Sequence, residues 1–217
     1  MKINCSPDAR GGMTLVEVMV LIAVLFILAA LVLPMRSTRV PSLRINCMSN
    51  QKQIGIGFLM YTEDNHGKFP MGISVSNGGT MEYLDRNQTF PHYQKLSANS
   101  ELIRSLVCPA DKNRQAATNF QSLTDANISY FLNANVSTNN PADSILSGDR
   151  HLQVSGQPVN HGTLIISSNS NVEWTAELHD GNGLLGFADG RAQFSRSGTL
   201  SSLIRAQNPA NQRFSVP

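Results

Sequence analysis

The chemistry available at the N-terminal end of this sequence depends on a single carboxylate. Glu17 stands directly before an apolar run, residues 18–33, that contains no other charged residue. A charged side chain at the centre of a bilayer costs about 2.5 to 3.5 kcal/mol on insertion scales, so an ionisable residue in such a segment indicates a function and a partner. The candidate partner is a new α-amine at Met13, created by cleavage after Gly12. With a reference pKa of about 7.7 to 8.0, that amine is cationic enough to pair with Glu17.

Cysteine usage offers a covalent possibility. The sequence has three cysteines, and removal of a leader ending at Gly12 would discard Cys5 and leave Cys47 and Cys108. In an oxidising compartment such a pair predicts a disulfide, which would close a loop of about 60 residues and stabilise the fold by about 4 kcal/mol in the chain-entropy model. Two separately buried thiols are the alternative that the sequence leaves open. No CxxC motif or Cys/His cluster predicts a zinc site.

His179 precedes Asp189-Gly190 by nine residues. Asp-Gly between two short alternating runs is typical of a tight hairpin in which the glycine adopts a positive φ, so we expect Asp189 to be a turn residue. His179 and Asp180 could form half of a metal or acid–base site with Asp189. We favour the simpler alternative, in which the imidazole hydrogen-bonds to the backbone or to a carboxylate at the hairpin.

Other chemistry has little support in the sequence. No serine-nucleophile elbow, phosphate-binding loop, zinc-protease helix or dinucleotide fingerprint is present, so we expect no enzyme and no cofactor. A net charge of +2 with 15% charged residues predicts no nucleic-acid binding. Calcium is possible through aspartate oxygens, although no spacing matches a known calcium loop. The aspartates concerned are Asp111, Asp143, Asp149, Asp180 and Asp189.

Two consecutive helical segments would position the N-terminal groups. Residues 13–35 amount to 23 residues, which exceeds the roughly 20 needed to span a hydrocarbon core. Residues 36–66 continue as an exposed helix, because apolar residues recur there at helical intervals and His66-Gly67 provides a C-terminal stop. Joined through bends at Pro34 and Pro41, the two segments predict a stalk of about 50 residues, roughly 75 Å long.

The remainder, residues 67–217, predicts one globular domain of antiparallel strands. The expected strands occupy residues 128–132, 152–154, 163–167, 172–176, 184–188 and 192–195, and a short helix occupies residues 197–207. The predicted fold class is therefore α+β, with a long N-terminal helix packed on a small antiparallel sheet.

The N-terminal residues resemble the type IV prepilin cleavage signal. That signal is a short polar leader ending in Gly, followed by a hydrophobic residue, Thr, Leu, any residue and Glu. The leader here also carries basic residues, and a proline stands where pilins commonly bend the helix. The matching positions are Lys2 and Arg10 in the leader 1–12, Gly12-Met13-Thr14-Leu15-Val16-Glu17 at the junction, and Pro34.

Later islands are similar to the pseudopilin-like proteins abundant in Planctomycetes and Verrucomicrobia. His179 with Asp189-Gly190 matches what is called the prepilin-type processing-associated H-X9-DG element, within a hairpin region near 179–195. Three further islands resemble landmarks of that group: residues 46–55, Cys108-Pro109-Ala110-Asp111, and residues 128–133.

The resemblance implies a pilin-like subunit. A prepilin peptidase would cut after Gly12 and methylate the amine of Met13, and Glu17 would pair with that amine between neighbouring subunits. The partners would be other pilin or pseudopilin subunits, in a type II secretion pseudopilus or a type IV pilus-like filament. Before assembly the chain would sit in the inner membrane, with its N-terminus cytoplasmic and its domain periplasmic or extracellular. The alternative is a membrane-tethered extracytoplasmic binding module exported with the same signal.

Overall fold

The computed structural model describes residues 12–32, 39–136, 144–167, 169–207 and 212–217. The chain divides into two compact units, residues 1–41 and 42–217. Most of the predicted leader, the bend at Pro34 and the candidate ligand Asp143 lie outside the described residues. So does the connection between the two predicted helical segments.

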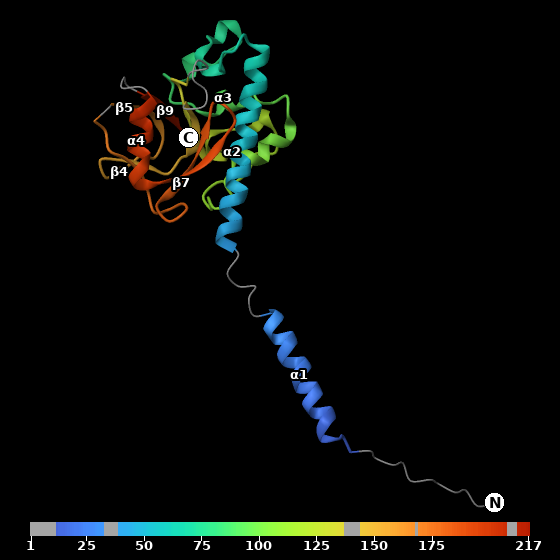
Figure 1. Ribbon diagram of the computed structural model, residues 1–217. Helices are drawn as coiled ribbons and strands as arrows, with labels where there is room; N and C mark the ends of the chain where they lie inside the picture. Colours follow the sequence, from blue (N-terminus) through green and yellow to red (C-terminus); the bar gives the residue numbers. More distant parts are fainter. Residues whose placement is uncertain (1–11, 33–38, 137–143, 168, 208–211) are drawn as a thin grey trace, which may run out of the picture. The chain divides into compact units, whose positions relative to one another are not determined.

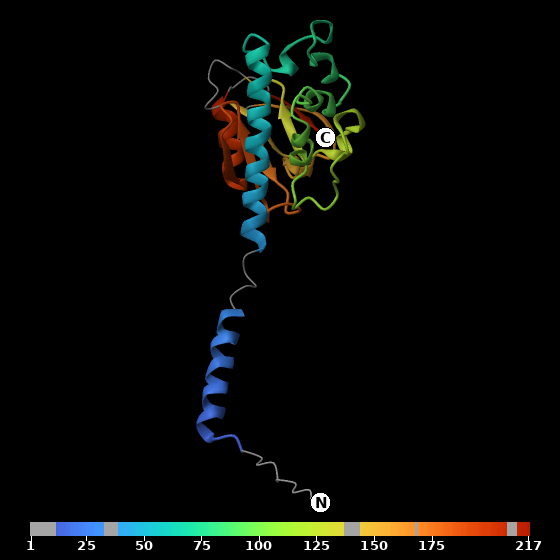
Figure 2. The same ribbon diagram turned by 90° about the vertical axis from the view of Figure 1, so that its right-hand side faces the viewer.

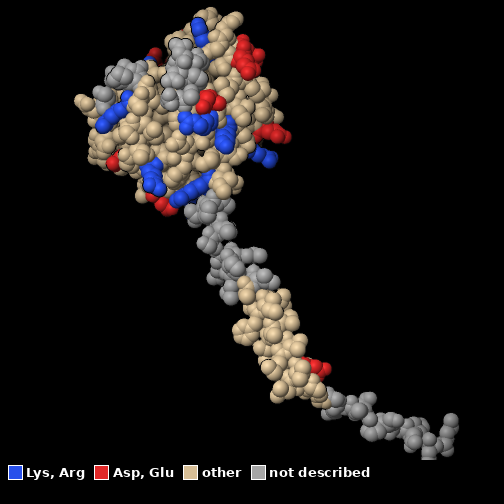
Figure 3. Space-filling model, in the orientation of Figure 1, with Lys and Arg blue, Asp and Glu red and all other residues tan. Residues whose placement is uncertain are grey.

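The first unit contains α1, Leu15–Val32. Its only charged residue is Glu17, in the first turn, and the surface of α1 in Figure 3 is uncharged apart from one acidic group. The large apolar side chains along it are exposed, from 42% for Val18 to 77% for Leu15. No helix in the part of the chain that the structure describes combines the length and the apolar character required to cross a membrane.

The second long helix, α2, covers Arg39–Asp64 and lies along the domain beside β7 (Figures 1 and 2). One face of α2 is buried at a spacing of three to four residues, through Cys47, Gln51, Ile54 and Phe58. This spacing matches one face of an α-helix. The helix ends where Gly67, at φ 73°, donates its N–H to the Thr62 carbonyl at 2.8 Å. The glycine therefore supplies the left-handed residue that commonly follows a helix.

A long segment without strands follows α2 and covers the same side of the domain. Its short helices pack Phe69, Tyr93, Leu106 and Phe120 into the core around Phe58. These helices are η2 Pro70–Gly72, η3 Val75–Asn77, η4 Met81–Tyr83, α3 Phe90–Gln94, η5 Ser100–Leu106, η6 Phe120–Ser122 and η7 Asp125–Asn127.

Two antiparallel sheets complete the domain. One has six strands in the order β5-β9-β1-β2-β7-β8, and the other has three in the order β4-β3-β6. Helix α4, Ser197–Gln207, follows β8. The strands are β1 Tyr130–Asn133, β2 Ile145–Asp149, β3 Leu152–Val154, β4 Gln157–Pro158, β5 Gly162–Ile166, β6 Val172–Trp174, β7 Asn182–Phe187, β8 Ala192–Arg196 and β9 Gln212–Val216.

Both faces of the six-stranded sheet are covered. Leu132 and Leu184 belong to the core that contains the buried face of α2, whereas Phe131 and Leu185 belong to a second core with α4 and β6. Successive side chains of a strand point to opposite faces, so neighbouring residues enter different cores. The sheet is therefore a buried middle layer, and α2 packs on one side of it.

The predicted α+β class is confirmed, but the prediction of one small sheet is wrong in the size and number of sheets. Strands β2, β4 and β9 were missed. The segment Ile145–Asp149 is buried along its whole length and lacks the alternation of a half-buried strand. Two helical segments were predicted at the N-terminal end, and the described residues hold two helices there, α1 and α2.

Candidate functional site

A disulfide joins α2 to the loop that follows η5. Cys47 and Cys108, both fully buried, are bonded across a sequence separation of 61 residues, with their Cα atoms 5.2 Å apart. The sequence left open a disulfide or two free thiols, and the structure has the disulfide. Because Cys47 belongs to the buried face of α2, the bond fixes this helix to the rest of the domain.

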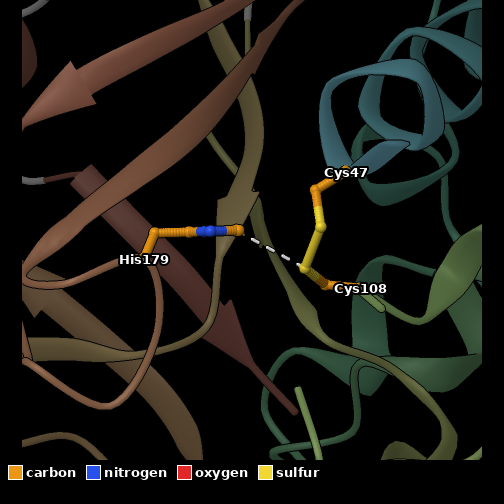
Figure 4. A group of neighbouring side chains, drawn as sticks. All are labelled: Cys47, Cys108 and His179. Carbon is orange, nitrogen blue, oxygen red and sulfur yellow. Dashed lines mark hydrogen bonds between the residues drawn. A yellow bond between two sulfur atoms is a disulfide. The ribbon is translucent and has the colours of Figure 1, made fainter. Parts of the chain in front are cut away.

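His179 lies against the disulfide (Figure 4). Its Nε2 is 3.5 Å from Cys108 Sγ. A disulfide sulfur carries no proton, so Nε2 must be the donor in this contact. The backbone at His179, Asp180 and Gly181 is left-handed, with φ values of 52°, 57° and 73°. Such values are costly for residues other than glycine and often occur at functional sites.

Contacts on both sides hold this left-handed turn in place. The Asn182 side-chain amide donates to the carbonyls of His179 and Asp180, at 3.2 and 3.1 Å. On the other side, Arg44 of α2 pairs with Asp180 at 3.1 Å. Arg44 and Cys47 are three residues apart and lie on the same helix face. One face of α2 therefore carries both the cysteine of the disulfide beside His179 and the arginine that pairs with Asp180.

A fully buried carboxylate lies beside the same imidazole. Asp149 Oδ2 is 3.7 Å from His179 Nε2 and accepts the Leu184 N–H at 2.8 Å. Burial, together with the charge of Asp111, raises the pKa of Asp149 to about 8. Burial, together with the cation of Arg44, lowers the pKa of His179. At neutral pH the pair is therefore a protonated carboxyl group beside a neutral imidazole. Asp149 Oδ1 has no hydrogen-bond partner among the described residues.

The residues after Asp149 form a second buried polar network. Arg150 contacts both carboxylate oxygens of Asp111, at 2.9 and 3.2 Å. His151 lies 3.6 Å from Asp111 and 2.8 Å from Glu177. Burial alone would raise the pKa of Asp111, but the neighbouring His151 ring and the Arg150 guanidinium together hold that pKa far below its usual value. Asp111 is thus an ionised structural carboxylate, and it fixes the loop that carries Cys108.

The hairpin predicted at Asp189-Gly190 is present between β7 and β8. Gly190 adopts φ 82° and donates its N–H to the Phe187 carbonyl at 3.0 Å, while Asp189 Oδ1 accepts the Arg191 N–H at 2.9 Å. The turn lies against α2, since a Cβ built on Gly55 would be 3.0 Å from Gly190 Cα. The two ends of the H-X9-DG element therefore contact α2 at two places, Cys47 through the disulfide and Gly55 directly.

The interpretation that linked His179 to the hairpin is wrong. Strand β7 lies between His179 and the turn at Asp189, and the imidazole contacts Cys108 and Asp149 instead. The carboxylate of Asp189 pairs instead with the neighbouring Arg191, 3.6 Å away. Sequence reasoning named Asp149 only as a possible calcium ligand and missed its place beside His179, because that proximity follows from the pairing of β2 with β7.

Comparisons of the chain with protein-family models, with curated proteins and with solved structures found no match. Within the chain itself, the islands quoted for the H-X9-DG resemblance converge on the disulfide. Cys47 and Cys108 form it and His179 contacts it. The remaining island forms β1, in which Tyr130 pairs with Asp149.

Four of the five aspartates proposed as calcium ligands belong to the described residues, and these four do not gather into one site. Asp111 is paired with Arg150, Asp180 with Arg44 and Asp189 with Arg191, while Asp149 is buried beside His179. Among the described residues, the only cluster of three or more metal-ligating side chains contains Cys47, Cys108 and His179. The prediction that no Cys/His cluster exists considered linear spacing alone, and this cluster forms only in space.

The N-terminal candidates Gly12, Met13 and Glu17 lie at the start of α1. The Thr14 N–H donates to Glu17 Oε2 at 2.8 Å, and the Glu17 N–H reaches Thr14 Oγ1 at 3.4 Å. This reciprocal pair is a capping box, in which a Glu three residues after a Thr N-cap satisfies the N-cap amide. The Thr-x-x-Glu spacing is a sequence signal for the start of a helix. Glu17 thus has a local structural role in addition to the predicted one.

Proposed function

We propose that the chain is a prepilin or pseudopilin, a structural subunit that assembles through its N-terminal helix into a type II secretion pseudopilus or a type IV pilus-like filament. The observation that carries the proposal is the surface of α1, which is apolar and exposed with Glu17 as its only charge. A helix that is hydrophobic all round is normally buried, either in a membrane or against other helices. Lipid of the inner membrane before assembly, and neighbouring subunits afterwards, would provide that burial.

The attachment of α2 to the domain supports the same function. A filament subunit has to transmit load between its helix and its outer domain. The disulfide at Cys47, the ion pair of Arg44 with Asp180 and the Gly55–Gly190 contact fasten α2 along its length. Three kinds of attachment on one helix face favour a rigid junction over a hinge.

Processing is the first step of the proposal. A prepilin peptidase would cut between Gly12 and Met13 and methylate the new amine, leaving it four residues before the carboxylate that caps α1. Gly12→Ala should leave an uncut precursor when the chain is expressed with the peptidase, detected as an unshifted intact mass. A correctly trimmed N-terminus in that variant would contradict the proposed junction.

The two roles of Glu17 can be separated by matched substitutions. Glutamine still completes a capping box, so Glu17→Gln should preserve the start of α1 while removing the charge. Glu17→Ala removes both. If the charge pairs with the amine of Met13 in a neighbouring subunit, both variants should be cleaved normally and should fail to form filaments, scored by electron microscopy of sheared material. Normal assembly by Glu17→Gln would reduce Glu17 to a helix cap and would refute the pairing.

The alternative, a tethered binding module, requires a ligand site on the domain. A cavity of about 470 Å³ lies at the end of α2, where Asp64, His66 and Lys68 line it together with apolar residues such as Ile73 and Met81. Its volume falls within the usual range for small-ligand sites, although such sites are mostly apolar. Persistence of the processed chain as monomers where the peptidase and the assembly machinery are active would favour this alternative over the filament.

A further inference from the structure

The disulfide and His179 form a group of ligand atoms contributed by three separate segments. Cys47 comes from α2, Cys108 from the loop after η5 and His179 from the left-handed turn before β7 (Figure 4). Their ligand atoms lie within 4.8 Å of one another, and all three residues are buried. Two thiolates and one imidazole are a common donor set for zinc.

The spacing fits tetrahedral coordination. With Zn–S near 2.3 Å and Zn–N near 2.0 to 2.1 Å, the S–N edge of a tetrahedron is about 3.6 Å and the S–S edge about 3.8 Å. The observed separation of His179 Nε2 from Cys108 Sγ, 3.5 Å, matches the first of these edges. Breaking the disulfide and separating the sulfurs by side-chain rotation would supply the second edge.

A candidate fourth donor lies next to the imidazole, just outside the group of three. Asp149 Oδ2 is 3.7 Å from His179 Nε2, and Oδ1 of this fully buried side chain has no hydrogen-bond partner among the described residues. A buried polar atom without a partner costs free energy and calls for an explanation. A cation bound between Asp149, His179 and the two sulfurs would be a partner for the carboxylate of Asp149.

We propose that Cys47, Cys108, His179 and Asp149 form a redox-gated binding site for a thiophilic divalent cation such as Zn²⁺. In the oxidised chain the sulfurs are bonded to each other and the site is closed. A dithiol reductant transfers two electrons and two protons to the disulfide, leaving two protein thiols and a cyclic disulfide of the reductant. Binding of Zn²⁺ then releases the two thiol protons and the carboxyl proton of Asp149, and moves the imidazole proton from Nε2 to Nδ1.

As a consequence, either the disulfide or a bound metal ion can fasten α2 to the domain. Disulfide and metal would connect the same points of α2, the Cys108 loop and the H-X9-DG turn. This scheme also explains the unfavourable left-handed backbone at His179, because the turn directs the imidazole toward the disulfide. The inference is independent of filament assembly and holds for a tethered binding module equally well.

The test uses the full chain purified in detergent, in a Cys5→Ser background so that only the two site cysteines remain. The disulfide is reduced anaerobically with a phosphine, which takes up the oxygen of water as the thiols form and is then removed. Co²⁺ is the probe, because tetrahedral thiolate coordination produces a charge-transfer band and intense visible absorption. We expect one Co²⁺ per reduced chain, displaced by Zn²⁺, and no such spectrum from the oxidised chain.

Variants decide whether this site is responsible. His179→Ala should weaken Co²⁺ binding at least 100-fold, and Asp149→Asn should weaken it about 10- to 100-fold, the range found when groups supporting a metal site are removed. His161→Ala is the matched control, because that histidine is 53% exposed and pairs with Asp125 away from the disulfide. No thiolate band in the reduced chain, or an unchanged affinity in His179→Ala, would overturn the proposal.

The proposal can also be tested if the chain loses its structure when the disulfide is reduced. If the reduced chain unfolds without metal, Zn²⁺ should refold it, since metal binding and folding are coupled in such sites. Near-ultraviolet circular dichroism of Trp174, which is buried in the domain, would report the recovery. Failure of Zn²⁺ to raise the melting temperature of the reduced chain, or an equal rise in His179→Ala, would also refute it.

Discussion

Removal of the Cys47–Cys108 bond should lower the stability of the domain by a calculable amount. The bond closes a loop of 61 residues, and the chain-entropy model gives about 4 kcal/mol at 25 °C for a loop of that length. For a domain of 150 to 250 residues, 1 kcal/mol corresponds to about 2 to 4 °C in melting temperature. The double variant Cys47→Ser, Cys108→Ser should therefore melt about 8 to 16 °C below the parent.

The assay is thermal unfolding of the full chain in detergent, with a chelator present so that no metal replaces the bond. The intrinsic fluorescence of Trp174, the only tryptophan of the sequence, reports the domain selectively. Cys5→Ser is the control, because it removes a thiol without removing the cross-link, and it should melt with the parent. A shift below about 4 °C in the double variant would mean that packing alone fixes α2, and the reasoning from loop closure would be refuted.

Three further predictions concern the turn, a buried histidine and a buried ion pair. Gly190→Ala should lower the free energy of unfolding by about 1 to 2 kcal/mol, measured with denaturant, because Gly190 adopts φ 82°. Asparagine tolerates this left-handed region, so Gly190→Asn should lower the free energy of unfolding by less. Equal losses in the two variants would contradict the explanation. Burial lowers the pKa of His92 to about 4. The pKa of a histidine in the unfolded chain is about 6.5, so between about pH 6.5 and 4 the unfolded chain binds a proton that the folded chain does not. The stability of the fold should therefore fall by up to roughly 3 kcal/mol as the pH drops from about 6.5 to 4. His92→Gln should flatten this pH dependence, and an unchanged slope in that variant would disprove the role of His92. Arg150→Met leaves the buried carboxylate of Asp111 without its arginine and should lower the free energy of unfolding by about 3 to 5 kcal/mol. Adding Asp111→Asn to the same chain should restore part of this loss. If the losses of the two substitutions simply add in the double variant, the ion pair is not the cause.

Features determined by neighbouring residues were predictable from the sequence. Helix α4, Ser197–Gln207, has the bounds that its residue pattern predicted, and α2 ends before Gly67 as its stop signal indicated. The Asp189-Gly190 turn was predictable because a glycine at positive φ is required locally. In each case the physical cause lies within a few residues of the feature.

Features determined by distant contacts were not predictable. Gln51 is a polar residue that is fully buried on α2, and Ser147 of β2 donates to its carbonyl oxygen at 2.6 Å. Asp149 reaches His179 only after β2 pairs with β7. The cysteines were identified from the sequence, but the imidazole and carboxylate around them depend on sheet pairing that one sequence does not reveal.

The place of β9 in the six-stranded sheet has a consequence for how the chain matures. Strand β9 hydrogen-bonds to β5 on one side and to β1 on the other, so it is the piece that connects β5 to the rest of this sheet. It is also translated after the other eight described strands. The sheet therefore stays in two unjoined parts, with open edges that invite aggregation, until the ribosome has made residue 216. The six-stranded sheet therefore cannot be completed strand by strand in the order of translation, and its closure depends on the last of the described strands.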